Sequence, residues 1–132
     1  MTMRTFVGLT GALSLVCVTA AFAGQAKPTS GATPAAAATP ESITNGAALY
    51  KRQCVMCHGA TGVGDGPAAK TLKGKLPSLA DKATMSKLTD AQIHEAITAG
   101  KKTDIGNMPA LGKRLKPEEI TDIVNFVRTL AK

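Results

Sequence analysis

Two cysteines and a histidine stand close together near the middle of the chain, in the order Cys54-Val55-Met56-Cys57-His58. In one helical turn, residues three apart project from the same side, so both sulfurs can reach one edge of a single ligand. The pattern Cys-x-x-Cys-His is the attachment sequence for a covalently bound c-type haem. We therefore predict that Cys54 and Cys57 form thioethers with the haem vinyl groups and that His58 is the proximal iron ligand.

Two other kinds of site could use the same residues. Cys54 and Cys57 could be a thioredoxin-like redox pair, but no βαβ pattern surrounds them. They could also be half of a zinc site completed by His58 and by the second histidine of the chain, His94. A second matching cysteine pair, which would strengthen that interpretation, is missing from the sequence. Haem attachment is therefore the favoured prediction.

The first 23 residues have the pattern of a secretory signal peptide. Arg4 supplies a positive charge, residues 6–20 form an apolar run, and residues 21–23 are a small-x-small cleavage site. We expect cleavage there, which removes Cys17 and leaves two cysteines for the haem. The apolar run is short for a membrane span, and an uncleaved anchor is the alternative. C-type haem is ligated outside the bacterial cytoplasmic membrane, so we expect a periplasmic protein, alternatively one tethered to the periplasmic face of the inner membrane.

Composition divides the rest of the chain into a linker and one folded domain. Residues 24–41 are rich in Pro, Ala, Gly, Ser and Thr, without a large apolar side chain, so we expect a disordered linker there. Residues 42–132 form the expected domain. Without the signal peptide the chain has 15 basic and 9 acidic side chains, a net charge of +6. An exported protein rarely meets nucleic acid, so this charge indicates redox partners with acidic docking surfaces or an anionic membrane surface, and a basic surface that only keeps the protein soluble is the alternative.

Helical periodicity predicts three main helices in this domain, at residues 44–53, 90–99 and 117–131. The first places Gly46 on the same face as Tyr50. The second begins with a Thr-x-x-Gln capping box and ends before a glycine. The third begins with a proline and has apolar residues at i, i+3, i+4 and i+7. No alternating strand pattern is present, so the predicted fold class is all-α.

An iron held by His58 alone would keep one axial position open, and three methionines of the mature chain could fill it. Met56 lies within the attachment turn and cannot reach the opposite face of the ring. Met85 has polar neighbours, and packing is its expected role. Met108 lies in an aperiodic loop before Pro109, which fixes φ and stiffens that loop. We therefore predict Met108 as the distal iron ligand, with packing as the alternative.

These motifs together resemble the class I cytochrome c family. The likeness covers residues 42–132 and includes the attachment motif, the glycine-rich residues 62–67, residues 106–109 and the terminal helix ending at residues 126–128. The resemblance implies a cytochrome c fold, in which three main helices and short helical turns pack around one covalently bound haem c.

The resemblance also assigns roles to particular positions. In that family the first and last helices cross beside the haem, where a glycine and an aromatic residue meet an aromatic residue. Gly46 and Tyr50 match the first helix, and Phe126 matches the last. The family further has a proline whose carbonyl accepts a hydrogen bond from Nδ1 of the proximal histidine. Pro67 and Pro77 are both candidates for that proline.

We therefore expect a periplasmic monohaem electron-transfer protein that shuttles single electrons between respiratory or other redox complexes. An iron with His and Met ligands changes little in geometry between Fe(II) and Fe(III), which suits electron transfer and not substrate chemistry. We accordingly expect no catalytic residues, no enzymatic activity and no small-molecule substrate. The alternatives are a cytochrome subunit of a membrane-associated dehydrogenase or oxidase, and a haem enzyme or sensor with an open axial site.

Overall fold

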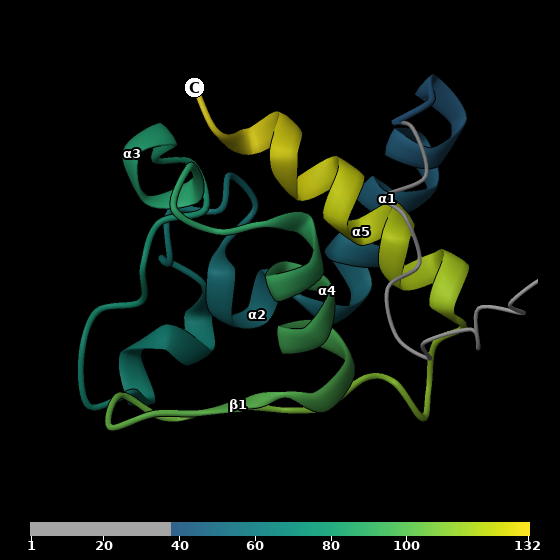
Figure 1. Cartoon of the computed structure of the whole chain (residues 1–132). Coiled ribbons are helices and arrows are strands. Elements are labelled where there is room, and N and C mark those ends of the chain that lie inside the picture. Colours follow the sequence, from purple (N-terminus) through teal and green to yellow (C-terminus); the bar gives the residue numbers. More distant parts are fainter. Residues whose placement is uncertain (1–37) are drawn as a thin grey trace, which may run out of the picture. The chain divides into compact units, whose positions relative to one another are not determined.

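The computed structural model describes residues 38–132 (Figure 1). The predicted signal peptide and most of the predicted linker lie outside the described residues. The described part of the chain is mainly helical, as expected, with one short hairpin. Its elements are α1 (Pro40–Gln53), α2 (Val55–His58), the 3-10 helix η1 (Pro67–Thr71), α3 (Lys82–Met85), α4 (Asp90–Ala99), β1 (Lys101–Lys102), β2 (Asn107–Met108) and α5 (Pro117–Leu130). None of the helices within this range is both long and apolar enough to cross a membrane.

Helix α1 begins one turn earlier than the sequence indicated. Thr39 has an extended backbone and its side-chain oxygen accepts a hydrogen bond from the Ser42 amide at 3.1 Å, while Pro40 occupies the first turn. A proline at this position suits a helix start, because its missing N–H has no partner there anyway. Residues 40 and 41, which we assigned to the linker, are therefore helical. The Thr39 cap sets the start of α1.

Helices α1 and α5 cross at Gly46, as the family resemblance implied (Figure 1). A Cβ atom at Gly46 would lie 2.0 Å from the backbone oxygen of Asp122 in α5. One turn further along, the rings of Tyr50 and Phe126 pack with centroids 5.2 Å apart and planes inclined at 56°. Close approach of two backbones explains why a glycine stands in the middle of a helix.

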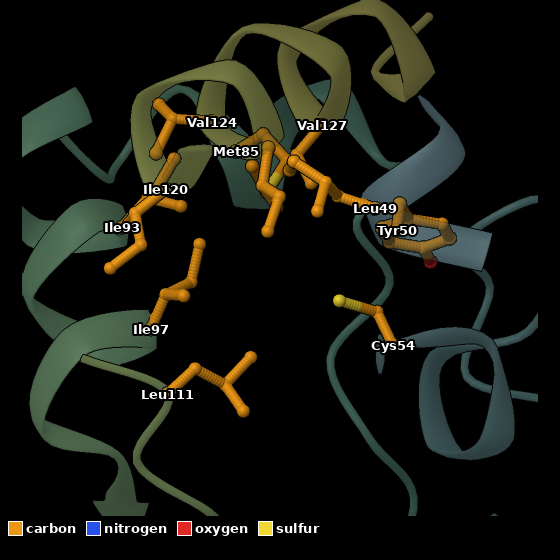
Figure 2. Close-up of a cluster of buried hydrophobic side chains, with 11 residues drawn as sticks. Leu49, Tyr50, Cys54, Met85, Ile93, Ile97, Leu111, Ile120, Val124 and Val127 are labelled. Atoms are coloured by element: carbon orange, nitrogen blue, oxygen red, sulfur yellow. The ribbon is translucent and has the colours of Figure 1, made fainter. Parts of the chain in front are cut away.

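The core lies between α1, α5 and α4 (Figure 2). Met85, at the end of α3, is only 1 % exposed and joins this core, which confirms the packing role expected for it. Helix α4 has the predicted bounds, and its capping box is present: the Thr89 amide donates to Gln92 Oε1 at 2.8 Å, and the Gln92 amide donates to Thr89 Oγ1 at 3.2 Å. The other core side chains are Leu49, Tyr50, Cys54, Ile93, Ile97, Leu111, Ile120, Ile123, Val124 and Val127.

Helix α5 ends at Leu130, one residue before the expected end, and a hairpin precedes it. Lys116 precedes α5 without a capping hydroxyl or carboxylate, and the Glu119 carboxylate compensates by accepting a hydrogen bond from the Lys116 amide at 2.8 Å. The antiparallel pair β1–β2 was not predicted. Each strand has two residues, with Lys101 opposite Met108. Strands this short cannot display an alternating pattern, so the sequence did not indicate them, and the all-α fold class is confirmed.

Candidate haem site

The attachment motif forms a single helical turn at the end of α1. Cys54 caps α1, and α2 follows directly from it. The amides of Cys57 and His58 both donate to the Cys54 carbonyl, at 3.1 and 2.9 Å. This turn places two sulfurs and an imidazole together, as the spacing predicted. Gly59 then ends the turn with a φ of 77°, a left-handed conformation that a glycine adopts without strain.

A cavity of about 260 Å³ opens beside this turn. Cys54, Cys57 and His58 line it, and so does Met108 from β2, so the structure brings all four predicted site residues to one cavity. In Figure 2 the Cys54 sulfur points towards Ile97 and Leu111 of the opposite side. The remaining lining is mostly apolar and consists of Leu72, Leu76, Pro77, Leu79, Ile105, Pro109 and Leu111, with Gln53, Lys101, Thr103, Gly106 and Asn107.

The His58 ring has one buried nitrogen, Nδ1, with no hydrogen-bond partner within residues 38–132. Burial lowers the pKa of His58, which favours the neutral imidazole that binds metals. Of the two candidate prolines, Pro77 lines the cavity together with His58, whereas Pro67 begins η1 and does not line it.

The environment of the cysteines disfavours both rival sites. Burial raises the pKa of Cys54 to about 11, with a smaller contribution from the neighbouring Cys57. A thiol held in its protonated form is a poor nucleophile for disulfide exchange, so burial disfavours the redox pair. Among the described residues no group of three or more His, Cys, Asp or Glu side chains could hold a metal ion. His94 does not line the cavity; its Nδ1 lies 3.3 Å from the Thr98 hydroxyl on α4.

The three methionines have separate environments. Met56 is 59 % exposed and Met85 is buried in the core, and neither lines the cavity. Met108 lines it and is half-buried. Gly100, with a φ of 76°, brings the start of β1 close to β2, because a Cβ there would lie 2.6 Å from the Met108 carbonyl oxygen. The hairpin thus holds Met108 at the cavity.

Some residues that line one edge of the cavity could not be identified from the sequence. Gln53 lines the cavity, and its side-chain oxygen accepts a hydrogen bond from Arg114 at 3.4 Å. Lys101 and Thr103 line it from the hairpin. The Thr103-Asp104-Ile105-Gly106 segment carries a turn signal, but nothing local shows that it covers a cavity.

These residues fit a covalently bound haem. The cavity is lined mainly by apolar side chains, as a porphyrin requires, and both thioether-forming sulfurs come from one turn. The buried Nδ1 of His58 leaves the other ring nitrogen for a metal in the cavity. A methionine sulfur is available from a different element.

Comparisons with known proteins show the family of the chain. The sequence model of the family described as cytochrome c oxidase, cbb3-type, subunit III matches residues 41–127. The chain is 31 % identical over 98 residues to the cbb3-type cytochrome c oxidase subunit CcoP of Rubrivivax gelatinosus, an alignment that covers 74 % of this chain and 29 % of that protein. The chain therefore spans less than a third of the length of this relative.

Three solved structures are similar. The c-type cytochrome KustC0563 is 29 % identical, with a TM-score of 0.55, over 66 % of this chain and 98 % of that one. The reducing HAO-like protein complex Kustc0457/Kustc0458 of Kuenenia stuttgartiensis is 22 % identical, with a TM-score of 0.63, over 75 % of this chain and 48 % of that one. The c-type cytochrome XoxG from Methylobacterium extorquens AM1 is 24 % identical, with a TM-score of 0.52, over 68 % of this chain and 50 % of that one. The last two show a shared fold. The chain belongs to the family of cbb3-type cytochrome c oxidase subunit III and is an electron-transfer c-type cytochrome with covalently bound haem c.

Proposed function

We propose that this chain is a periplasmic monohaem electron carrier whose iron is held between His58 and Met108. One observation carries the proposal: among the described methionines, Met108 alone lines the cavity that also contains His58 and both cysteines. The two side chains come from separate elements, α2 and β2, so each can approach a flat ligand from its own side.

The other residues of the site have supporting roles in this proposal. Cys54 and Cys57 would form the thioethers that hold the haem to the chain. His58 would be the proximal ligand. Its Nδ1 has no hydrogen-bond partner in the described part of the chain, and the Pro77 carbonyl is the candidate acceptor in the holoprotein; the position of Pro77 at the cavity supports this choice over Pro67. The apolar lining excludes water, which limits the change in solvation when the charge of the site changes by one.

When bound, haem c supplies a one-electron Fe(II)/Fe(III) couple. If His58 and Met108 both bind the iron, they would leave it no position open to a substrate or a gas. A methionine ligand also raises the reduction potential relative to a second nitrogen ligand. The arrangement therefore supports electron transfer and gives no place for catalysis.

The ferric spectrum of the holoprotein tests the axial ligands. We expect the weak far-red methionine-to-iron charge-transfer band in the wild type, its loss in Met108→Ala, and its retention in Met56→Ala, a matched control at an exposed methionine. Retention of the band in Met108→Ala would contradict the proposal and transfer the ligand role to Met85. A five-coordinate high-spin spectrum of the wild type would favour the haem enzyme or sensor.

A second candidate is a cytochrome subunit or domain of a membrane-bound oxidase. The match to a family described as an oxidase subunit, and to less than a third of CcoP, favours this alternative. Intact mass of the haem-containing protein purified from its host distinguishes the two. Loss of residues 1–23 supports the free carrier, and their retention supports a tethered subunit.

A further inference from the structure

The family resemblance accounts for the ring of Tyr50, which packs against Phe126, but gives no role to its hydroxyl group. Tyr50 is the single tyrosine of the chain and is only 2 % exposed. Its hydroxyl donates a hydrogen bond to the buried Gly59 carbonyl at 2.9 Å. Burial raises the pKa of Tyr50 to about 12, so the hydroxyl keeps the proton that it donates. A phenylalanine could fill this space without a polar group to satisfy, so the hydroxyl needs an explanation of its own.

Tyr50 holds the attachment motif at both of its ends. Its backbone carbonyl accepts a hydrogen bond from the Cys54 amide at 2.9 Å, and its hydroxyl reaches the residue that follows His58. In Figure 2 Tyr50 and Cys54 lie next to each other on one side of the core. The five residues 54–58 therefore lie between two hydrogen bonds to one residue of α1. Within residues 38–132 no other side chain donates a hydrogen bond to the backbone of residues 54–59.

A glycine-rich loop, residues 59–66, closes over the same turn. The Gly64 amide donates a hydrogen bond to the His58 carbonyl at 2.8 Å. The Gly59 carbonyl accepts a second hydrogen bond, from the Gly62 amide, at the longer distance of 3.3 Å. The carbonyls of two successive residues are thus fixed, and the Tyr50 hydroxyl is the nearer of the two donors to the second one. It therefore contributes to the placement of the backbone that presents the proximal histidine.

We infer that Tyr50 is a positioning residue of the redox centre: its hydroxyl fixes the Gly59 carbonyl, and with it the backbone that presents the His58 imidazole, in a way that favours Fe(II) over Fe(III). This inference rests on the proposed function. Fe(III) carries one positive charge more than Fe(II), so a nearby carbonyl oxygen stabilises it when the partial negative charge of that oxygen is not compensated. The hydroxyl hydrogen compensates this charge at Gly59. A firmly held turn also limits the access of water, which stabilises the more highly charged state.

Two variants of the holoprotein test this role. Tyr50→Phe keeps the ring and removes the hydroxyl. Arg128→Lys is the control, because it removes side-chain hydrogen bonds between α5 and residues 85–90 and, like Tyr50→Phe, leaves the net charge at neutral pH unchanged. Each protein is titrated with a mixture of ferricyanide and ferrocyanide: one electron leaves the ferrous cytochrome, and ferricyanide becomes ferrocyanide. Haem absorbance gives the equilibrium constant.

We expect the equilibrium of Tyr50→Phe to move about 3-fold towards the ferric form, which is the effect of part of one hydrogen bond, and that of Arg128→Lys to move less than about 1.5-fold. We also expect the proton NMR shifts of the haem methyl groups in the ferric protein, which report the orientation of the axial ligands, to change in Tyr50→Phe alone. An equal shift of the equilibrium in both variants, or none in Tyr50→Phe, would overturn the inference, because the hydroxyl would then have only a structural role.

A second change strengthens the hydrogen bond instead of removing it. Because Tyr50 is the single tyrosine, 3-fluorotyrosine supplied during expression replaces this residue and no other. Fluorine makes the phenol more acidic and therefore a stronger donor, while the ring is retained. We expect the equilibrium to move in the opposite direction, towards the ferrous form. A move towards the ferric form, or none, would contradict the inference, since disturbed packing and not the hydrogen bond would then explain the result for Tyr50→Phe.

The far-red band of the same samples separates this inference from the proposed function. Its absence from the wild type would contradict the His58/Met108 proposal. The titrations would remain valid in that case, because Tyr50 acts on the side of the iron that His58 faces, whatever ligand lies opposite.

Discussion

Replacement of Gly46 by alanine tests whether the contact between α1 and α5 controls the stability of the domain. In an isolated helix this change is favourable by about 1 kcal/mol. In the folded protein the new Cβ would lie 2.0 Å from the Asp122 carbonyl oxygen, 2.6 Å from its carbon and 2.9 Å from Phe126 Cβ. Two of these atoms belong to the backbone, so no rotamer change relieves the clash. The helices have to move apart.

Forced separation of well-packed elements costs about 1–3 kcal/mol, and occasionally more. The cost here includes the contact between Tyr50 and Phe126, which depends on the same crossing. We expect Gly46→Ala to lower the free energy of unfolding by about 2 kcal/mol net of the propensity gain, which is about 10 °C in Tm for a domain of this size.

Thermal unfolding of the holoprotein, followed by far-ultraviolet circular dichroism and by haem absorbance, measures this difference. Asn45→Ala is the matched control, because Asn45 is exposed on the same helix and gains propensity without a clash. We expect its Tm to equal or slightly exceed that of the wild type. If Gly46→Ala were as stable as Asn45→Ala, close backbone contact would not be the reason for the glycine.

Three further substitutions test side-chain hydrogen bonds that stabilise the domain. Tyr50→Phe removes the hydrogen bond that the hydroxyl donates to the buried Gly59 carbonyl at 2.9 Å, and we expect a loss of about 1–3 kcal/mol in urea unfolding. Burial raises the pKa of Tyr50 to about 12. Between pH 10 and 12 the tyrosine ionises in the unfolded chain but not in the folded one, so the wild type should lose stability over this range. Tyr50→Phe should not show that loss. The planar guanidinium group of Arg128 donates hydrogen bonds to Asp90 at 2.6 Å and to the Met85 and Leu88 carbonyls. Arg128→Lys keeps the charge but loses this geometry, and we expect about 2 kcal/mol of destabilisation in urea unfolding. Arg52→Lys, at an exposed position, is the control and should cause none. The Asp81 carboxylate accepts hydrogen bonds from Thr84, and these hold its pKa below the ordinary value of 3.8. The carboxylate therefore stabilises the folded state above that pH, and this stabilisation is lost as the pH falls. Asp81→Asn should flatten the acid side of the profile of stability against pH, and an unchanged profile would contradict the role of this cap.

Features encoded by neighbouring residues were predictable from the sequence. The capping box and final glycine of α4 are local signals, and its bounds were correct. The crossing of α1 and α5 at Gly46 was also predictable. The family resemblance explained why a glycine, which destabilises a helix relative to alanine, stands at this position. The start of α1 was misplaced, since Thr39 caps the helix and Pro40 occupies its first turn, in a stretch whose composition indicated a linker.

Features that depend on residues far apart in the chain were not predictable in this way. The bond between Arg114 and Gln53 joins positions 61 apart, and nothing near either residue indicates the other. The hairpin that holds Met108 consists of strands too short for any periodicity. The choice of Met108 over Met85 followed from the setting of each residue, and the structure places them in the cavity and in the core respectively. The iron ligands themselves remain predictions.

The cavity also bears on how the domain depends on its haem. It is not enclosed, so without haem its apolar lining is in contact with water. Haem attached to Cys54 and Cys57 would cover that lining and stabilise the folded state relative to the unfolded chain. We therefore expect the holoprotein to unfold at a higher temperature than the apoprotein.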